Sequence, residues 1–142
     1  MSESGYSGTP LMKKLGAKPG MAALYVNVPD TITPMHGWPD WGKLDRVSKP
    51  RKVGDGPYDY IHIFETERAR LDAALPALKV ALSQTGMIWV SWPKKTAKME
   101  TTLDGNIVRS LGLAAGLVDI KVCAVDETWS GLKFVIPVKD RR

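Results

Sequence analysis

The sequence predicts a three-layer α/β fold built on a mostly parallel β-sheet. Apolar, β-branched runs of strand length alternate along the chain with segments whose leucines recur at helical spacing. This alternation is typical of parallel βαβ units with right-handed crossovers. The last two apolar runs have only a short connection, so we expect them to form an antiparallel hairpin. The result would be a Rossmann-like sheet that is parallel except at one edge, where the C-terminal hairpin lies.

Five runs have the composition of buried strands, because they are rich in β-branched, aromatic and aliphatic residues. They cover residues 21–28, 58–64, 87–92, 117–125 and 132–138. Glycine and proline interrupt residues 31–45, where we expect a short helix or an irregular crossover. The basic segment 45–57 is loop-like, with a short edge strand expected near Val47.

Two segments carry an apolar stripe at helical spacing. The first stripe consists of Leu71, Leu75, Leu78 and Leu82. We expect this helix to kink or divide at Pro76, because proline lacks an amide hydrogen, and to end at Gly86. The second stripe runs over residues 103–111, and Gly112 is expected to end it.

The totals fit one α/β domain over residues 9–142, preceded by a flexible arm at 1–8 that is polar and rich in Gly and Ser. Cys123 is the only cysteine, so no intramolecular disulfide can form, which indicates a reducing compartment. The sequence has neither a secretory signal nor an apolar run long enough to span a membrane, so we expect a cytoplasmic protein.

The formal net charge is +5, from 20 Lys+Arg against 15 Asp+Glu. Most basic residues gather in four segments, at 13–18, 46–52, 94–98 and 139–142. If these segments share a face, their lysines would contact the phosphates of a nucleic acid without reading its sequence. No nucleic-acid-binding motif is present. A nucleic-acid-associated accessory protein is therefore an alternative, and dispersed, solvated lysines explain the same composition.

Three distinctive segments stand out: SGTPLMKKLGAKPG at 7–20, VSWPKK at 90–95 and GLVDIKVCAVDETWSGLKFV at 116–135. Through them the chain resembles a bacterial family known as domain of unknown function 3052, over most of its length. The resemblance implies a bacterial cytoplasmic protein with a Rossmann-like fold, and it implies no catalytic residue.

In outline the expected sheet is similar to a degenerate class I methyltransferase fold, which also finishes with an antiparallel strand. Such sheets bind their ligand beyond the carboxyl ends of the strands, at the switch point in strand order. A Gly-rich turn normally follows the first strand there, but no glycine lies between Val26 and Gly37. Lys49 stands where an acidic partner for a ribose would follow the second strand. The sequence therefore argues against S-adenosylmethionine and NAD, and we expect no cofactor.

The residue types that often act in catalysis are explained better by structural roles than by catalytic ones. His62 lies between two isoleucines of a strand, which predicts a hydrogen-bonded core histidine, and Cys123 predicts a packed thiol. Ser91 and Lys94 match the S-x-x-K pattern, but Ser91 ends a strand rather than lying on a helix. No metal site is expected, since neither histidine has a Cys or His at ligand spacing.

Polar and aromatic residues are expected to gather where the parallel strands end. The predicted ligand-binding residues are Lys94 and Lys95 for an anion, Asp126 and Glu127 for polar specificity, a half-exposed Trp129 for apolar contact, and Asn27 and Asp30 beside them. Alternatively, the carboxylates pair with the lysines and only fasten the hairpin.

These residues favour a non-catalytic binding protein for a small anionic ligand or a protein partner. A divergent methyltransferase-like enzyme using the same edge is the alternative. An open cavity above Val28 would favour that enzyme, and a side chain such as Tyr25 or Trp92 filling the space would exclude it.

Overall fold

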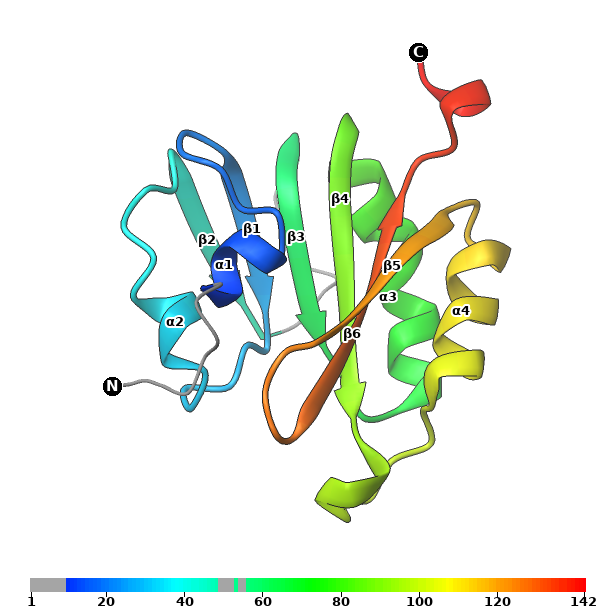
Figure 1. Ribbon diagram of the computed structural model, residues 1–142. Coiled ribbons are helices and arrows are strands. Elements are labelled where there is room, and N and C mark those ends of the chain that lie inside the picture. Colours follow the sequence, from blue (N-terminus) through cyan, green and yellow to red (C-terminus); the bar gives the residue numbers. More distant parts are fainter. Residues whose placement is uncertain (1–9, 49–52, 54–55) are drawn as a thin grey trace.

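A six-stranded sheet forms the centre of the computed structural model, with helices against both of its faces (Figure 1). The structure describes residues 10–48, 53 and 56–142, so the predicted arm at 1–8 lies outside the described residues. The strands are β1 (Ala22–Val26), β2 (Lys43–Val47), β3 (Tyr58–Phe64), β4 (Leu82–Pro93), β5 (Val118–Ala124) and β6 (Trp129–Val135). Their order across the sheet is β2-β1-β3-β4-β6-β5.

The sheet is parallel from β2 to β4, and the final hairpin is antiparallel, as the sequence predicted. The hairpin lies at one edge of the sheet, as predicted. β6 pairs in antiparallel fashion with both β4 and β5, so it lies inside the sheet, and β5 forms the edge.

Two pairs of helices cover the two faces and complete the three layers. One face carries α1 (Leu11–Lys14) and α2 (Thr33–His36), and the other carries α3 (Arg68–Ala81) and α4 (Gly105–Ala114). Short 3₁₀ turns follow β4 and β6, at Lys95–Ala97 and Val138–Asp140. Within the described ranges, every helix is too short or too polar to cross a membrane.

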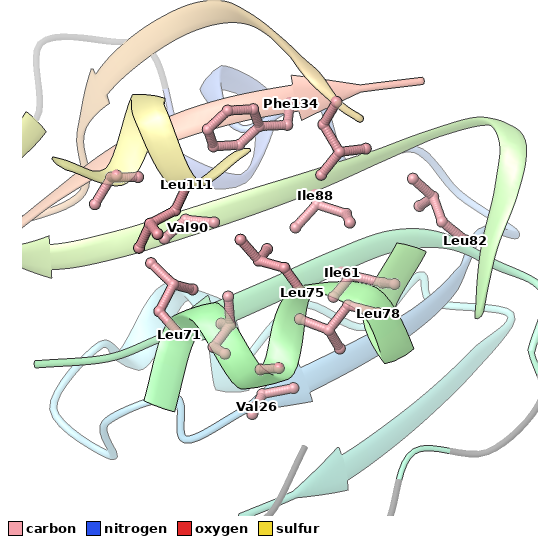
Figure 2. Packing of buried hydrophobic residues seen from close by; sticks show 14 of the residues in the cluster. Val26, Ile61, Leu71, Leu75, Leu78, Leu82, Ile88, Val90, Leu111 and Phe134 are labelled. Atoms are coloured by element: carbon pink, nitrogen blue, oxygen red, sulfur yellow. The ribbon is translucent and has the colours of Figure 1, made fainter. Parts of the chain in front are cut away.

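The leucine stripe of α3 packs against the middle of the sheet (Figure 2). Leu71, Leu75 and Leu78 face Ile61 of β3 and Ile88 of β4, and all five are fully or almost fully buried. Burying each such side chain contributes roughly 1.5–3 kcal/mol, so this layer fixes the central strands that lead to the carboxyl edge.

The boundary between α3 and β4 differs from the prediction. The helix ends at Ala81 rather than Gly86, and β4 begins at Leu82, because Leu82 pairs with Tyr58 of β3. Pro76 lies inside α3 without dividing it. Pairing with a distant strand has overridden the helical pattern of residues 82–86.

Two glycines have packing roles that the sequence did not predict. Gly112 does not end α4, which continues to Ala114. Glycine is needed at this position because a Cβ would overlap the ring of Phe134. Gly131 lies in β6, where a Cβ would come within 3.1 Å of the Trp89 ring. Both glycines allow a neighbouring aromatic ring to approach the backbone closely.

Candidate functional site

The carboxyl ends of β1 to β4 meet at one edge of the sheet, beside the tip of the β5–β6 hairpin. The chain leaves β1 for its neighbour β2 and then crosses back to β3 on the other side of β1, so the switch point lies between β1 and β3. Ligands of open α/β sheets bind outside this point. Two cavities lie along the edge.

The first cavity, called here the β1–β2 cavity, has a volume of about 440 Å³. It lies between the ends of β1 and β2 and helix α2, and its polar lining comprises Tyr25, Asn27, Asp30, His36, Arg46 and Ser48. Its volume falls within the range of about 300–1,000 Å³ that is usual for small-molecule sites.

Tyr25 forms a fixed wall of this cavity and does not fill it. Its hydroxyl donates to the Met35 carbonyl at 2.8 Å and accepts from the Trp41 indole N–H at 3.0 Å. Burial raises the pKa of Tyr25 to about 12, so the ring stays neutral. Val28 lines the same open space, which is the observation expected of the enzyme alternative.

Among the described residues of the lining, Arg46 supplies the guanidinium, which lies over the Tyr25 ring with 5.8 Å between the guanidinium carbon and the ring centroid. A cation over an aromatic face is attracted by the ring quadrupole, which holds the side chain at the cavity wall. Nearby, His36 Nε2 lies 3.0 Å from the Pro29 carbonyl and ties α2 to the loop after β1. Neither residue was predicted to be a site residue: Arg46 lies in a basic run on a short strand, and His36 lies in a segment interrupted by glycine and proline.

Asn27 makes the tight turn that follows β1. Its φ of 58° lies in the left-handed region, which asparagine tolerates better than most residues other than glycine. Its backbone N–H donates to the Val47 carbonyl at 3.1 Å, joining the ends of β1 and β2. A search for glycine alone misses this turn, and an asparagine directly after the strand is the signal that finds it.

The second cavity, called here the hairpin cavity, has a volume of about 560 Å³. It lies between the start of α1, residues 31–34 and the hairpin tip at 125–128. Asp126 and Glu127 supply its acidic lining, which includes no basic residue from the described ranges. The start of α1 meets the hairpin tip here, and the loop after β4 reaches the tip through the Lys94 N–H, which donates to the Thr128 carbonyl at 2.8 Å.

The hairpin tip is held by its own carboxylate. Asp126 Oδ1 accepts from the backbone N–H groups of Thr128 and Trp129, both at 2.8 Å. Within the described part of the chain, no ion pair joins Lys94 or Lys95 to the tip carboxylates. The tip is therefore fastened to the loop after β4 by a backbone hydrogen bond rather than by the expected salt bridges.

Trp129 lies in β6 and belongs to the core, so the prediction of a half-exposed side chain is wrong. Only 8% of it is exposed, and its ring packs edge-on against Phe64 with centroids 5.1 Å apart. Its surface is already occupied by protein, so it offers little area to a ligand.

The predicted site residues thus separate into groups. Asn27 and Asp30 line the β1–β2 cavity, and Asp126 and Glu127 line the hairpin cavity. Lys94, half-buried, and Lys95, exposed, line neither cavity.

Glu65 also lies at this edge, where three donors converge on its Oε1. It accepts from the N–H groups of Thr66 and Glu67 at 2.8 and 3.1 Å and from Arg70 Nε at 2.9 Å. Since only 5% of Glu65 is exposed, it serves to start α3 rather than to bind a ligand.

His62 is a hydrogen-bonded core histidine, as predicted. Its Nδ1 lies 2.9 Å from the Tyr60 hydroxyl and its Nε2 lies 2.7 Å from the Ser91 hydroxyl. Burial lowers the pKa of His62 to about 3, so the ring is neutral at physiological pH. The same contact occupies Ser91, whose hydroxyl partner is His62 rather than Lys94, and Cys123 is a buried thiol. Across the described ranges, no group of three His, Cys, Asp or Glu residues is placed to hold a metal ion.

Solved structures resemble this arrangement although no family model and no curated protein matches the sequence. Magnesium protoporphyrin IX methyltransferase from Synechocystis PCC 6803 with bound SAH shares 9% identity at a TM-score of 0.62, over 88% of this chain and 78% of that one. The TehB-like SAM-dependent methyltransferase from Corynebacterium glutamicum shares 11% identity at a TM-score of 0.56, over 89% and 85%. The PH0226 protein from Pyrococcus horikoshii OT3 shares 10% identity at a TM-score of 0.60, over 89% of this chain and 85% of that one.

The chain has a methyltransferase-like Rossmann fold. The inserted antiparallel β6 and the likeness to these structures confirm the predicted fold class. At 9–11% identity, the likeness concerns the fold alone.

Proposed function

We propose that this chain binds a small anionic ligand in the β1–β2 cavity, which lies next to the switch point of its methyltransferase-like sheet. The observation that carries the proposal is Arg46, whose guanidinium lines a cavity at the strand ends, where open α/β sheets bind ligands. No carboxylate among the described residues forms an ion pair with Arg46. Its planar fork of donors suits a carboxylate or phosphate group.

The rest of the lining supports binding of a polar molecule of small size. Asn27 and Ser48 offer amide and hydroxyl groups, and His36 offers an imidazole. Asp30 carries a negative charge, so it would accept from hydroxyl or amino groups of the ligand rather than meet its anionic end. The lining therefore favours a ligand with an anionic end and hydrogen-bond donors elsewhere.

Replacement of Arg46 by Gln is expected to weaken the binding of such a ligand by at least about tenfold, because a charge-assisted hydrogen bond contributes roughly 1.5–3 kcal/mol. Isothermal titration calorimetry with a panel of nucleotides and of phosphorylated and carboxylated metabolites measures the effect. Arg68→Gln is the matched control, since Arg68 is exposed at the start of α3. Equal affinity of the wild type and Arg46→Gln for every bound ligand contradicts the proposal.

A divergent S-adenosylmethionine-dependent methyltransferase is the second candidate. The open cavity beside Val28 and the left-handed turn at Asn27 favour it, together with similar solved proteins whose structures hold SAM or SAH. Calorimetry with SAM and SAH separates the two candidates. Binding that is lost in Val28→Trp, which fills the cavity, supports the enzyme, whereas binding of anions without SAM or SAH supports the binding protein.

A further inference from the structure

We propose that a cluster of three lysines, Lys18, Lys121 and Lys133, binds a phosphate group at the end of α1. The cluster lies on the α1 side of β5 and β6, at one end of the strand order. The β1–β2 cavity lies at the ends of β1 and β2, at the other end of the strand order. The proposal therefore does not depend on the function proposed above. It assigns a binding role to three of the basic residues that give the chain its positive net charge.

The strand register places two of these lysines directly opposite each other. Lys121 of β5 pairs with Lys133 of β6 in the antiparallel ladder, so their side chains leave the same face of the sheet. Like charges directly opposite each other destabilise a sheet. A pair of this kind is unfavourable in the folded chain unless an anion joins it.

Both ammonium groups reach the end of α1. Lys121 Nζ donates to the Lys14 carbonyl at 3.3 Å, and Lys133 Nζ lies 3.5 Å from the position that a Cβ at Gly16 would occupy. Lys18 follows in the next turn and acts electrostatically on Lys133. Segments far apart in the sequence thus bring three positive charges together.

The cluster lacks a compensating carboxylate in the part of the chain that the structure describes. No Asp or Glu there forms an ion pair with any of the three lysines. Lys133 is half-buried, and its burial, together with the charges of Lys121 and Lys18, lowers its pKa. The folded chain therefore holds a partly desolvated positive charge beside two others, which an anion that binds only the folded state would stabilise.

A phosphate group fits these three donors better than a carboxylate does. It carries up to two negative charges and several acceptor oxygens, which three ammonium groups can share. Lysine acts on phosphate as a point charge and reads no base sequence. The ligand is thus defined by its phosphate, whether that belongs to a small polyphosphate or to a nucleic acid backbone.

The first test measures thermal unfolding of the full chain with and without 1 mM sodium tripolyphosphate. Tripolyphosphate is expected to raise the Tm of the wild type by about 3 °C or more, less so as NaCl is added. Lys133→Met is expected to have a higher Tm than the wild type without tripolyphosphate and to lose the shift. Lys139→Met, which removes an exposed lysine of the last 3₁₀ turn, is expected to keep the shift at the same net charge.

The second test separates the two sources of phosphate. Fluorescence anisotropy of a labelled single-stranded oligonucleotide is expected to give a salt slope of about −2 for three phosphate contacts, and Lys133→Met is expected to reduce its magnitude by about 0.7. Oligonucleotide binding with this change assigns the phosphate to nucleic acid, and a tripolyphosphate effect alone assigns it to a small ligand.

Two results overturn the proposal: the same response to both probes in Lys133→Met and the wild type, or no response of the wild type to either probe. If Lys133→Met does not fold, Lys121→Met replaces it with the same expectations. Lys133→Met tests this cluster and Arg46→Gln tests the β1–β2 cavity, so failure of one proposal is distinct from failure of the other.

Discussion

Acidification from pH 6.5 to pH 3 is expected to lower the free energy of unfolding by up to about 4 kcal/mol through His62 alone. Burial holds the pKa of this histidine at about 3 in the folded chain, against an ordinary value of 6.5. Between these values the unfolded chain binds a proton that the folded chain does not. The stabilisation is therefore complete above pH 6.5 and is lost as the pH falls toward 3.

The measurement is urea unfolding at a series of pH values between 7 and 3.5, with His62→Gln as the comparison. Glutamine retains an amide for the Tyr60 and Ser91 hydroxyls but does not titrate. The difference in stability between the two proteins is expected to shrink or reverse as the pH falls. Carboxylates contribute equally to both proteins and cancel in the difference, so parallel curves would show that His62 is not the origin of the slope.

Gly112→Ala is expected to destabilise the chain by about 3 kcal/mol, at the upper end of the usual cost of overpacking. In an exposed helix the same change stabilises by roughly 1 kcal/mol, because alanine has the higher helix propensity. Here the new methyl group would overlap the fully buried Phe134 ring, so α4 has to move away from β6.

Gly105→Ala in the same helix is the matched control, since its Cβ would meet Trp92 at an ordinary 3.4 Å. Its stability is expected to stay within about 1 kcal/mol of the wild type. Adding Phe134→Leu to Gly112→Ala is expected to recover part of the loss in a double-mutant cycle. Unchanged stability in Gly112→Ala would mean that α4 and β6 are not in contact as described.

Strands whose composition and flanking residues agree could be predicted closely from the sequence. The run at 58–64 coincides with β3, because aromatic and β-branched residues follow a Gly-Pro break. The start of β4 could not be predicted, since Leu82 continues the leucine stripe of α3 and becomes a strand residue only by pairing with Tyr58. Likewise, the sequence alone predicts that Gly112 ends a helix, because the contact with Phe134 that requires glycine there is visible only in the structure.

The predicted parallel topology indicated that the candidate site would lie at the carboxyl edge of the sheet. Its division into two cavities did not, because the lateral distance between Asn27 and Asp126 depends on strand order, which no local pattern records. Arg46 was visible only as part of a basic run, since the strand that carries it is short and half-exposed. Side chains at strand ends were thus assigned to the correct edge, but not to the correct neighbours.

The position of β6 determines the order in which the sheet can be completed during synthesis. β5 leaves the ribosome before β6, yet β6 is its only neighbour in the sheet. β5 therefore stays undocked until β6 has emerged, and the two enter as a hairpin. Until then the long strand β4 presents an unpaired edge, which is a template for aggregation. A nascent chain that stops before β6 therefore lacks this partner of β4 and carries an unpaired strand edge.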